Sequence, residues 1–367
     1  MSQKIPWAQP EIDKNELNQL LDSFDVGWLT MGPKVKKFER VMADYVGAPH
    51  AVAVTNGTVA LDLSLKCLGI APGDEVIVPA MTYFATASAV SYQHAVPVFV
   101  DVDPISFNLD PNKIEEAISP KCKAIVFIDY GGNPADIEGL KAVARKHNLL
   151  LLQDAAQSLG GIYQDKFLGA QTPISTMSFH MAKVMTTVEG GMIFAHSKEV
   201  AEELRVRRNQ GESAKYIHSH LGTNARMTDL CAAIGLAQFK KLPWMLRERQ
   251  RVATRYDSYF KSHEKIRVTS CLQPDSTNAY FFYPVMVDSR SMVVEKLKEK
   301  GIDTRIAYPM PLYEQDLYRK KGGRAYRKMS CPVAEHFTSS VINLPIFPSL
   351  HNDQVDIIAS ELLEALA

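Results

Sequence analysis

Short apolar segments alternate with helix-like stretches from about residue 50 onward, and this alternation strongly limits the folds open to the chain. The segments are nearly continuous in Val, Ile, Leu and Phe, as expected for strands covered on both faces. Such alternation predicts an α/β fold with a mainly parallel sheet wrapped by helices. The first five predicted strands are AVAVTN (51–56), EVIVPA (75–80), VPVFVDV (96–102), AIVFIDY (124–130) and LLLLQDA (149–155).

Two more strand-like segments bring the predicted sheet to seven strands. They are TMSFH (176–180) and GMIFAH (191–196), joined through Lys183 and a Glu189-Gly190-Gly191 turn. Helices are predicted between the earlier strands, and one of them has an apolar face that consists of Ile137, Leu140, Val143 and Ala144. The predicted helical segments are TVALDLSLKCLG, PNKIEEAIS and DIEGLKAVARKHN.

The second half of the chain predicts a smaller domain. RVRRNQGESAKYIHSH is polar and indicates an exposed loop, and a long helical segment follows in which Pro243 should break or kink the helix. Past it, FFYPVMV and VVEKLKEKG are typical of a small α+β unit. We therefore expect a large domain over residues 1–245 and a small one over residues 246–367, since 367 residues exceed one ordinary core.

The composition argues against several classes of function. Lys plus Arg and Asp plus Glu both number 41, which gives no support to nucleic-acid or anionic-membrane binding and weakly favours self-association. The N-terminus lacks the apolar segment of a signal peptide, and no stretch approaches the ~20 apolar residues of a membrane span. The cysteines have no metal-type spacing, so we expect no metal site and reduced thiols in a cytoplasmic protein. They are Cys67, Cys122, Cys231, Cys271 and Cys331.

Three features along the chain are candidates for chemistry. Asp154 ends a predicted strand, where open α/β sheets bind ligands, although an Asp there is often only a cap. Lys183 follows another strand, although a loop lysine is usually solvated. Asn56-Gly57-Thr58 opens a helix and presents free N–H groups to an anion, which alone is a weak signal.

Together these features supply what pyridoxal phosphate needs. Gly57 and Thr58 give an anion cradle, Asp154 a carboxylate for the pyridine nitrogen, and Lys183 an amine for a Schiff base and for proton transfer. Tyr83 follows the next strand and would cover the ring, unless it is merely a half-buried aromatic. The chain has no GxGxxG, GxxxxGK[ST], GxSxG or HExxH, which argues against dinucleotide, P-loop, hydrolase and zincin chemistry.

Motifs through nearly the whole chain resemble the DegT/DnrJ/EryC1/StrS family of sugar aminotransferases. The resemblance implies the fold type I architecture, with a large pyridoxal-phosphate-binding domain and a small C-terminal domain. The segments that carry it include GWLTMGPKVKKFE (27–39), NGTVALDLSLKCLGIAPGDEVIVPAMTYFATASAV (56–90), QDAAQSLGG (153–161), SFHMAKVMTTVEGGMI (178–193), TNARMTDLCAAIGL (223–236) and GIDTRIAYPMPLY (301–313).

The resemblance also implies roles for individual residues. Lys183 would hold the cofactor, Asp154 would pair with the pyridine nitrogen, and Gln157 would contact the phenolic oxygen. Tyr83 would stack on the ring. The phosphate ligands would be Gly57, Thr58, Ser178 and, from the neighbouring subunit, Asn224, which implies a homodimer with shared active sites. From the sequence alone, Asn224 would be an ordinary helix start. The substrate pocket would include Thr30, Gly32, Tyr308 and Tyr313.

The segment SFHMAKVMTTVEGG is similar to the corresponding segment of enzymes that aminate C4 of nucleotide-linked 4-keto hexoses. The resemblance implies a role in polysaccharide or antibiotic biosynthesis, with L-glutamate as amino donor. RIAYPMPLY stands where the family often has RxHYPxPLH, which weakens any inference about the sugar. Amination of a 3-keto sugar or a keto-cyclitol stays open. So does a non-catalytic, cofactor-binding regulator of the same fold. Lys183 favours transamination over the dehydration performed by members that have histidine there.

Overall fold

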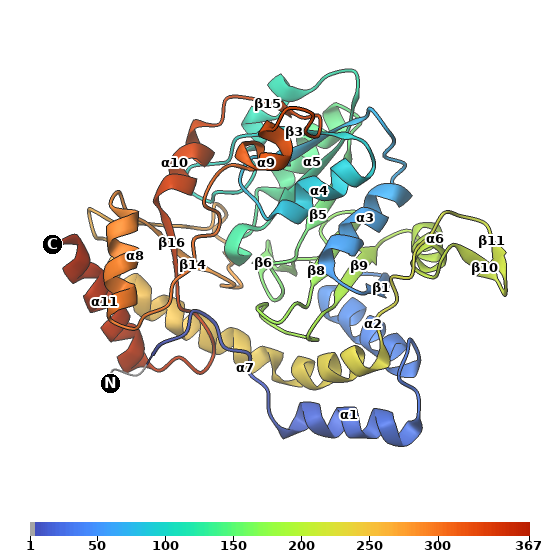
Figure 1. Ribbon diagram of the computed structural model, residues 1–367, viewed down its shortest axis with the longest axis horizontal. Helices are drawn as coiled ribbons and strands as arrows, with labels where there is room; N and C mark the ends of the chain where they lie inside the picture. The colour runs from blue at the N-terminus through green and yellow to red at the C-terminus, as the bar shows by residue number, and fades with distance from the viewer. Residues whose placement is uncertain (1–3) are drawn as a thin grey trace.

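A computed structural model describes residues 4–367 and contains all seven predicted strands in one sheet (Figure 1). The strand order is β1-β9-β8-β5-β4-β2-β3-β15, and β9 is antiparallel to both of its neighbours. The sheet has eight strands rather than seven, because Arg327–Lys328 (β15) pairs in parallel with β3. The other strands are β1 (His50–Val54), β2 (Glu75–Pro79), β3 (Val96–Val100), β4 (Cys122–Ile128), β5 (Leu150–Asp154), β8 (Ile174–Ser178) and β9 (Gly191–Ala195).

Helices cover both faces of this sheet, which explains the continuous apolar strands. On one face, Val76 and Val78 of β2 belong to the same buried cluster as Ala60 of α3 (Gly57–Cys67). On the other, Ile77 clusters with α5 (Ile137–Lys146). Further helices of this part are α1 (Lys14–Val26), α2 (Pro33–Val46), α4 (Phe84–Tyr92) and α6 (Lys198–Arg208).

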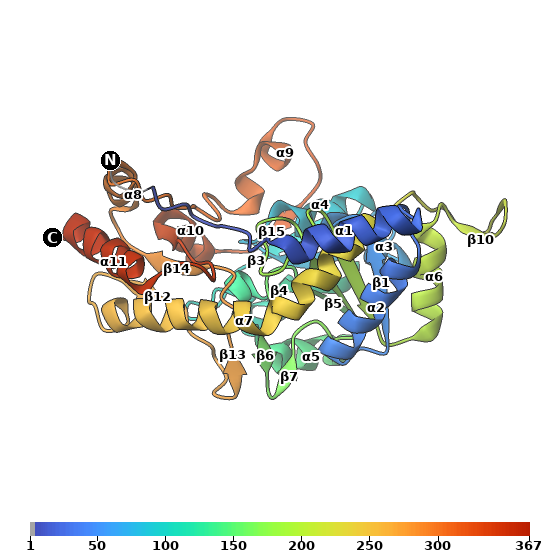
Figure 2. The ribbon, with the colours of Figure 1, turned by 90° about the horizontal axis from the view of Figure 1, so that it is seen from below.

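One local prediction was wrong, and another was right only in part. PNKIEEAIS forms only two 3₁₀ turns, Pro111–Lys113 and Glu115–Ala117, since Pro120 disfavours a helical residue before it and so short a segment cannot sustain a helix. The predicted polar loop begins instead inside α6, whose Arg208 is buried, with Ser197 capping the helix start. The rest of that segment forms a hairpin, β10 (Glu212–Ala214) with β11 (Ile217–His218), which extends away from the body (Figures 1 and 2).

The long helix α7 (Asp229–Phe260) runs from the large sheet into the C-terminal part. Pro243 lies inside it without breaking it, and Figure 2 shows the helix axis bending about halfway along. The predicted domain boundary at residue 245 therefore falls within one helix and stays a proposal. Residues 1–3 of the predicted large domain lie outside the described residues.

The C-terminal part has a buried core of its own. Tyr256 and Phe260 of α7 pack there with α8 (Arg290–Glu299) and α11 (Asn352–Leu366). Its antiparallel sheet has the order β12-β14-β16. No helix within residues 4–367 is long and apolar enough to cross a membrane. The remaining elements are β6 (Ile162–Tyr163), β7 (Lys166–Phe167), β12 (Arg267–Val268), β13 (Ser276–Thr277), β14 (Tyr283–Met286), α9 (Asp316–Arg319), α10 (Pro332–Ser340) and β16 (Val341–Leu344).

Candidate active site

Asp154 is the last residue of β5 and lies almost fully buried, with 6% of its surface exposed. Each carboxylate oxygen accepts one hydrogen bond: Oδ2 from the Thr86 hydroxyl at 2.9 Å and Oδ1 from the Ala156 N–H at 3.2 Å. Burial raises the pKa of Asp154, and these two donors oppose that rise. The charge on Lys183 also opposes the rise. The two hydrogen-bond donors are neutral, so they orient the carboxylate and leave its charge to attract a cationic group on a ligand.

Lys183 lies on the loop between β8 and β9, beyond the same edge of the sheet. Its Nζ atom is 4.4 Å from the centre of the Phe281 ring, which comes from the C-terminal part just before β14. Burial lowers the pKa of Lys183 from 10.5 to about 8, and the charge on Asp154 opposes that change. An amine with such a pKa is partly neutral near physiological pH, as a nucleophilic lysine must be.

The start of α3 forms an anion cradle beside these groups. Asn56 caps the helix by accepting the Val59 N–H at 2.9 Å, which leaves the N–H groups of Gly57 and Thr58 at the helix N-terminus. A Cβ atom on Gly57 would lie 3.0 Å from Cβ of Ser178, so a side chain there would crowd the cradle. The predicted residues Gly57, Thr58 and Ser178 are thus gathered at one place.

Gln157 and Tyr308 connect this edge to the C-terminal part. The Gly131 N–H donates to Oε1 of Gln157 at 2.8 Å, and Nε2 of Gln157 donates to the Tyr308 hydroxyl at 2.9 Å. Since Gly131 occupies the carbonyl oxygen, the amide nitrogen faces Tyr308 and keeps a second hydrogen for another acceptor. Tyr83 starts α4 with 60% of its surface exposed, and its ring centre is 6.2 Å from that of Tyr308.

Thr30 and Gly32 lie at the start of α2, and Asn224 lies shortly before the start of α7. The Gly32 N–H donates to Asp229 at 2.9 Å, and the Asp229 N–H donates to the Thr30 carbonyl at 3.0 Å. Asn224 pairs with Asn209 in an isolated bridge. The next residue, Ala225, accepts the N–H of Thr55, two residues before the cradle.

Tyr313 differs from the other predicted substrate residues. It is 1% exposed, its hydroxyl donates to Glu335 at 2.6 Å, and its ring packs against Phe99. Among the described residues these contacts place it in the packed interior beside β3, so its role in the pocket stays a prediction that no contact supports.

Sequence reasoning missed two residues of the site, Phe281 over Lys183 and Thr86 on Asp154. Thr86 stands in the segment PAMTYFATASAV, but its contact reaches across 68 residues of sequence. The aromatic run from Tyr280 to Tyr283 was visible, but nothing in it indicated which ring would face the lysine.

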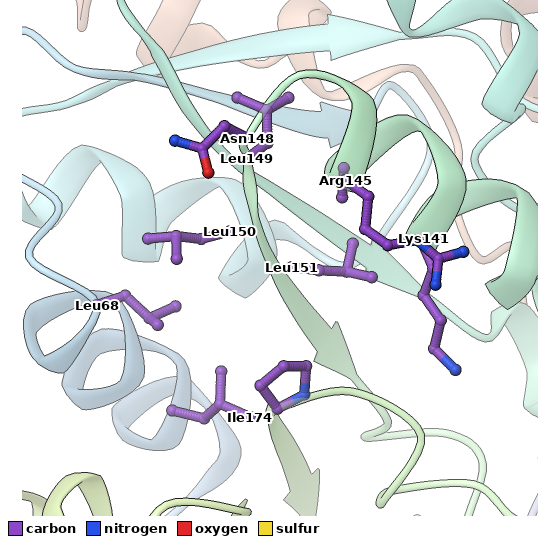
Figure 3. A pocket seen from close by; sticks show the side chains of 10 residues that line it. Leu68, Lys141, Arg145, Asn148, Leu149, Leu150, Leu151 and Ile174 are labelled. Atoms are coloured by element: carbon purple, nitrogen blue, oxygen red, sulfur yellow. The ribbon is translucent and has the colours of Figure 1, made fainter.

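The opposite end of the sheet also has a hollow (Figure 3). A cavity of about 480 Å³ opens where β5 and β8 begin, and most of its lining is apolar. The lining residues are Leu68, Lys141, Ala144, Arg145, Asn148, Leu149, Leu150, Leu151, Pro173 and Ile174.

Comparison with known proteins shows the family to which the chain belongs. The sequence model of the DegT/DnrJ/EryC1/StrS aminotransferase family matches residues 10–363. The chain belongs to this family. Its fold is the fold type I architecture of pyridoxal-phosphate aminotransferases, as the resemblance implied. The protein is an enzyme of the transaminase class, and its cofactor is pyridoxal phosphate.

Individual relatives match along almost their whole length. The spore coat polysaccharide biosynthesis protein SpsC of Bacillus subtilis (strain 168) is 34% identical over 371 residues, covering 96% of this chain and 94% of SpsC. The UDP-2-acetamido-2-deoxy-3-oxo-D-glucuronate aminotransferase of Pseudomonas aeruginosa is 34% identical over 359 residues, 95% of this chain and 98% of that protein. The solved structure of S. venezuelae DesV superposes with a TM-score of 0.94 at 33% identity, covering 98% of each chain.

The residues gathered at this edge fit the cofactor. Phosphate requires N–H and hydroxyl donors, which Gly57, Thr58 and Ser178 supply at a helix N-terminus. A pyridine nitrogen that must stay protonated requires a carboxylate, and Asp154 is buried and held in place. The aldehyde requires an amine of lowered pKa, which Lys183 provides.

Proposed function

We propose that this aminotransferase transfers an amino group from L-glutamate to a nucleotide-linked keto sugar, with a 4-keto hexose as substrate and an amino sugar as product. The observation that carries the proposal is the buried Asp154 and the half-buried Lys183 at the same edge of the sheet as the anion cradle of α3. The names of the relatives support the substrate class, since one acts on a UDP-linked 3-oxo sugar and another serves polysaccharide biosynthesis.

Each side chain has a definite task in this proposal. Pyridoxal phosphate supplies an electron sink next to the reacting carbon. Asp154 holds a proton on the pyridine nitrogen, because an adjacent carboxylate raises the pKa of that nitrogen. Lys183 holds the cofactor covalently and, once released, moves a proton at its Nζ atom. Gln157 would donate the remaining hydrogen on its Nε2 atom to the phenolic oxygen of the cofactor.

The substrate side of the site combines aromatic and polar groups. Tyr83 is exposed, and its ring lies beside that of Tyr308. In this proposal Tyr83 would stack on the cofactor ring, and Tyr308 would contact the sugar. The Phe281 ring lies 4.4 Å from Nζ of Lys183 and shields the amine from water on that side. We assign Thr30 and Gly32 to the sugar pocket of the neighbouring subunit, since both are hydrogen-bonded to Asp229 at the start of α7, five residues beyond Asn224.

One observation favours a second substrate. The Pseudomonas aeruginosa relative acts on a 3-oxo sugar by name, and it is as similar to this chain as SpsC. A 3-keto sugar nucleotide is therefore the alternative substrate, with a keto-cyclitol as a further candidate. The chemistry at Lys183 is the same for all three, so the pocket alone distinguishes them.

The test is a screen of nucleotide-linked 4-keto and 3-keto sugars and keto-cyclitols, each with L-glutamate or L-glutamine as donor. We expect fastest formation of the amino sugar, with matching release of 2-oxoglutarate, from a nucleotide-linked 4-keto hexose and L-glutamate. Faster turnover of a 3-keto sugar would replace the first proposal by the second. Conversion of the bound cofactor by L-glutamate without turnover of any keto sugar would contradict both.

We further propose a homodimer in which Asn224 binds the phosphate of the partner's cofactor. The β10–β11 hairpin follows α6 and extends from the body (Figure 1) with Tyr216 82% exposed, as expected of a segment that reaches a second subunit.

We also propose a cytoplasmic location, which is supported by the five cysteines, all of them free.

Mixing two inactive variants, Lys183→Ala and Asn224→Asp, tests the shared site. Each mixed dimer would have one site with both defects and one with neither, so activity should partly return as subunits exchange. The introduced carboxylate would repel the phosphate, so Asn224→Asp alone should be inactive. A mixture that exchanges subunits and stays inactive would show that each chain builds its site alone.

A further inference from the structure

A chain of buried hydroxyl groups ends on the Asp154 carboxylate. The Thr86 hydroxyl lies 2.9 Å from Oδ2 of Asp154, and the Thr82 hydroxyl lies 3.0 Å from the Thr86 hydroxyl. Thr82 and Thr86 are at most 1% exposed, so water does not compete for these hydrogen bonds. Thr82 lies just before α4 and Thr86 lies in the first turn of that helix, four residues later.

The direction of this chain follows from the number of hydrogens. Thr86 has a single hydroxyl hydrogen, and its contact with a carboxylate that has no hydrogen requires Thr86 to donate it. Thr86 then offers only lone pairs to Thr82, so Thr82 is the donor in that contact. Two donors in series polarise one another and favour the ionised state of the acceptor at the end.

We propose that Thr86, supported by Thr82, is a positioning residue that keeps Asp154 ionised and aimed at the cofactor's pyridine nitrogen. The inference rests on the proposed function, in which Asp154 faces that nitrogen. Without Thr86, the proton shared between Asp154 and the ring would move toward the carboxylate, because the anion would lose one of its two donors. The ring would then be a weaker electron sink, although phosphate binding and the Lys183 linkage would be unchanged.

The test compares Thr86→Val, which keeps the shape of the side chain, with Thr86→Ser, which keeps the hydroxyl. Each protein is loaded with cofactor labelled with nitrogen-15 in the ring, and the chemical shift of that nitrogen reports its protonation. We expect the parent and Thr86→Ser to give the protonated signature and Thr86→Val to shift toward the unprotonated one. The half-reaction of Thr86→Val with L-glutamate should slow by about tenfold, the effect of one hydrogen bond to a charged group.

Ser88→Ala is the matched control, since Ser88 is a buried hydroxyl on the same helix whose contact is the Ala85 carbonyl. It should match the parent in both measurements. Thr82→Val removes only the first donor, so it should shift the signal in the same direction by a smaller amount, and it keeps the test available if Thr86→Val does not fold.

An unchanged nitrogen signal in Thr86→Val would overturn the proposal, as would a Thr86→Ser protein that behaves like Thr86→Val. The nitrogen signal needs no sugar substrate, so it separates this proposal from the proposed function. If the parent shows the protonated ring but aminates no keto sugar, the proposed substrate fails and the role of Thr86 still stands or falls on the variants.

Discussion

The two ends of strand β5 contrast with each other. At its start, Leu150 is 40% exposed and borders the cavity of about 480 Å³, whose lining is largely apolar (Figure 3). At its end, four residues later, Asp154 is buried and accepts two hydrogen bonds. A search for a ligand site by volume alone would choose the first end, because about 300–1,000 Å³ is the usual size of such a pocket.

The chemistry identifies the second end instead. The cavity does contain cations, but Lys141 pairs with Glu138 at 2.7 Å and its neighbours supply no buried carboxylate. At the other end, a lysine of lowered pKa, a buried carboxylate and a helix N-terminus converge. Convergence of groups with perturbed pKa is therefore a better guide to function here than the size of a hollow.

The largest expected effect distinguishes the two ends directly. Lys183→Ala should reduce turnover by about 10⁴-fold or more, because the variant loses both the covalent anchor and the proton carrier. Arg145→Ala, at the cavity, should keep the parent rate. The measurement is the steady-state turnover rate of the two variants, with their folding checked by circular dichroism. Turnover of Lys183→Ala close to that of the parent would show that the Lys183 end of the sheet is not the catalytic end.

Asp154→Asn should have the next largest effect. An adjacent carboxylate raises the pKa of the ring nitrogen by about 1–3 units, so its loss should slow the half-reaction with L-glutamate by about 10- to 1,000-fold. Stopped-flow absorbance of the bound cofactor follows this half-reaction. A rate within threefold of the parent would remove Asp154 from the role assigned to it.

The pH dependence of cofactor capture should show a smaller effect. The neutral amine attacks the aldehyde, and the pKa of Lys183 in the folded protein is about 8 rather than 10.5. Capture by the cofactor-free protein should therefore speed up by about tenfold between pH 7 and pH 9 and level off above that. A rate that keeps rising toward pH 10.5 would mean that burial does not perturb this lysine.

The smallest effect is expected at the cavity itself. Leu150→Ser should leave turnover unchanged and shift the free energy of unfolding by less than about 1 kcal/mol, because Leu150 is partly exposed. Leu152→Ala, two residues along the same strand and fully buried, should cost about 2–5 kcal/mol. Thermal unfolding and kinetics compare the two. A loss of activity in Leu150→Ser would assign a function to this end as well.

The fold of the large sheet could be predicted because its strands are covered on both faces. Burial forces continuous apolar segments such as Ala124–Ile128, and these are visible without any partner. The eighth strand could not be predicted in this way. Arg327–Lys328 joins β3 from far along the chain, and two charged residues carry no strand pattern.

The residues of the candidate site likewise divide into those that a local sequence pattern indicates and those that it does not. Asp154 ends one strand and Lys183 follows another, so their position at one edge of the sheet could be inferred from sequence. Phe281 and Thr86 act through contacts between distant segments, which no local pattern encodes. Tyr313 shows the limit of a motif: its position in RIAYPMPLY suggested the pocket, while its ring is packed against Phe99.

The most direct test of the account is the identity of the lysine that holds the cofactor. Reduction of the cofactor-loaded protein with borohydride fixes the linkage, and mass spectrometry of the peptides then locates it. The account predicts a phosphopyridoxyl group on the peptide that contains Lys183, and on no peptide from the Lys141 region at the other end of β5. A label on another lysine, or an active enzyme that carries no label, would contradict it.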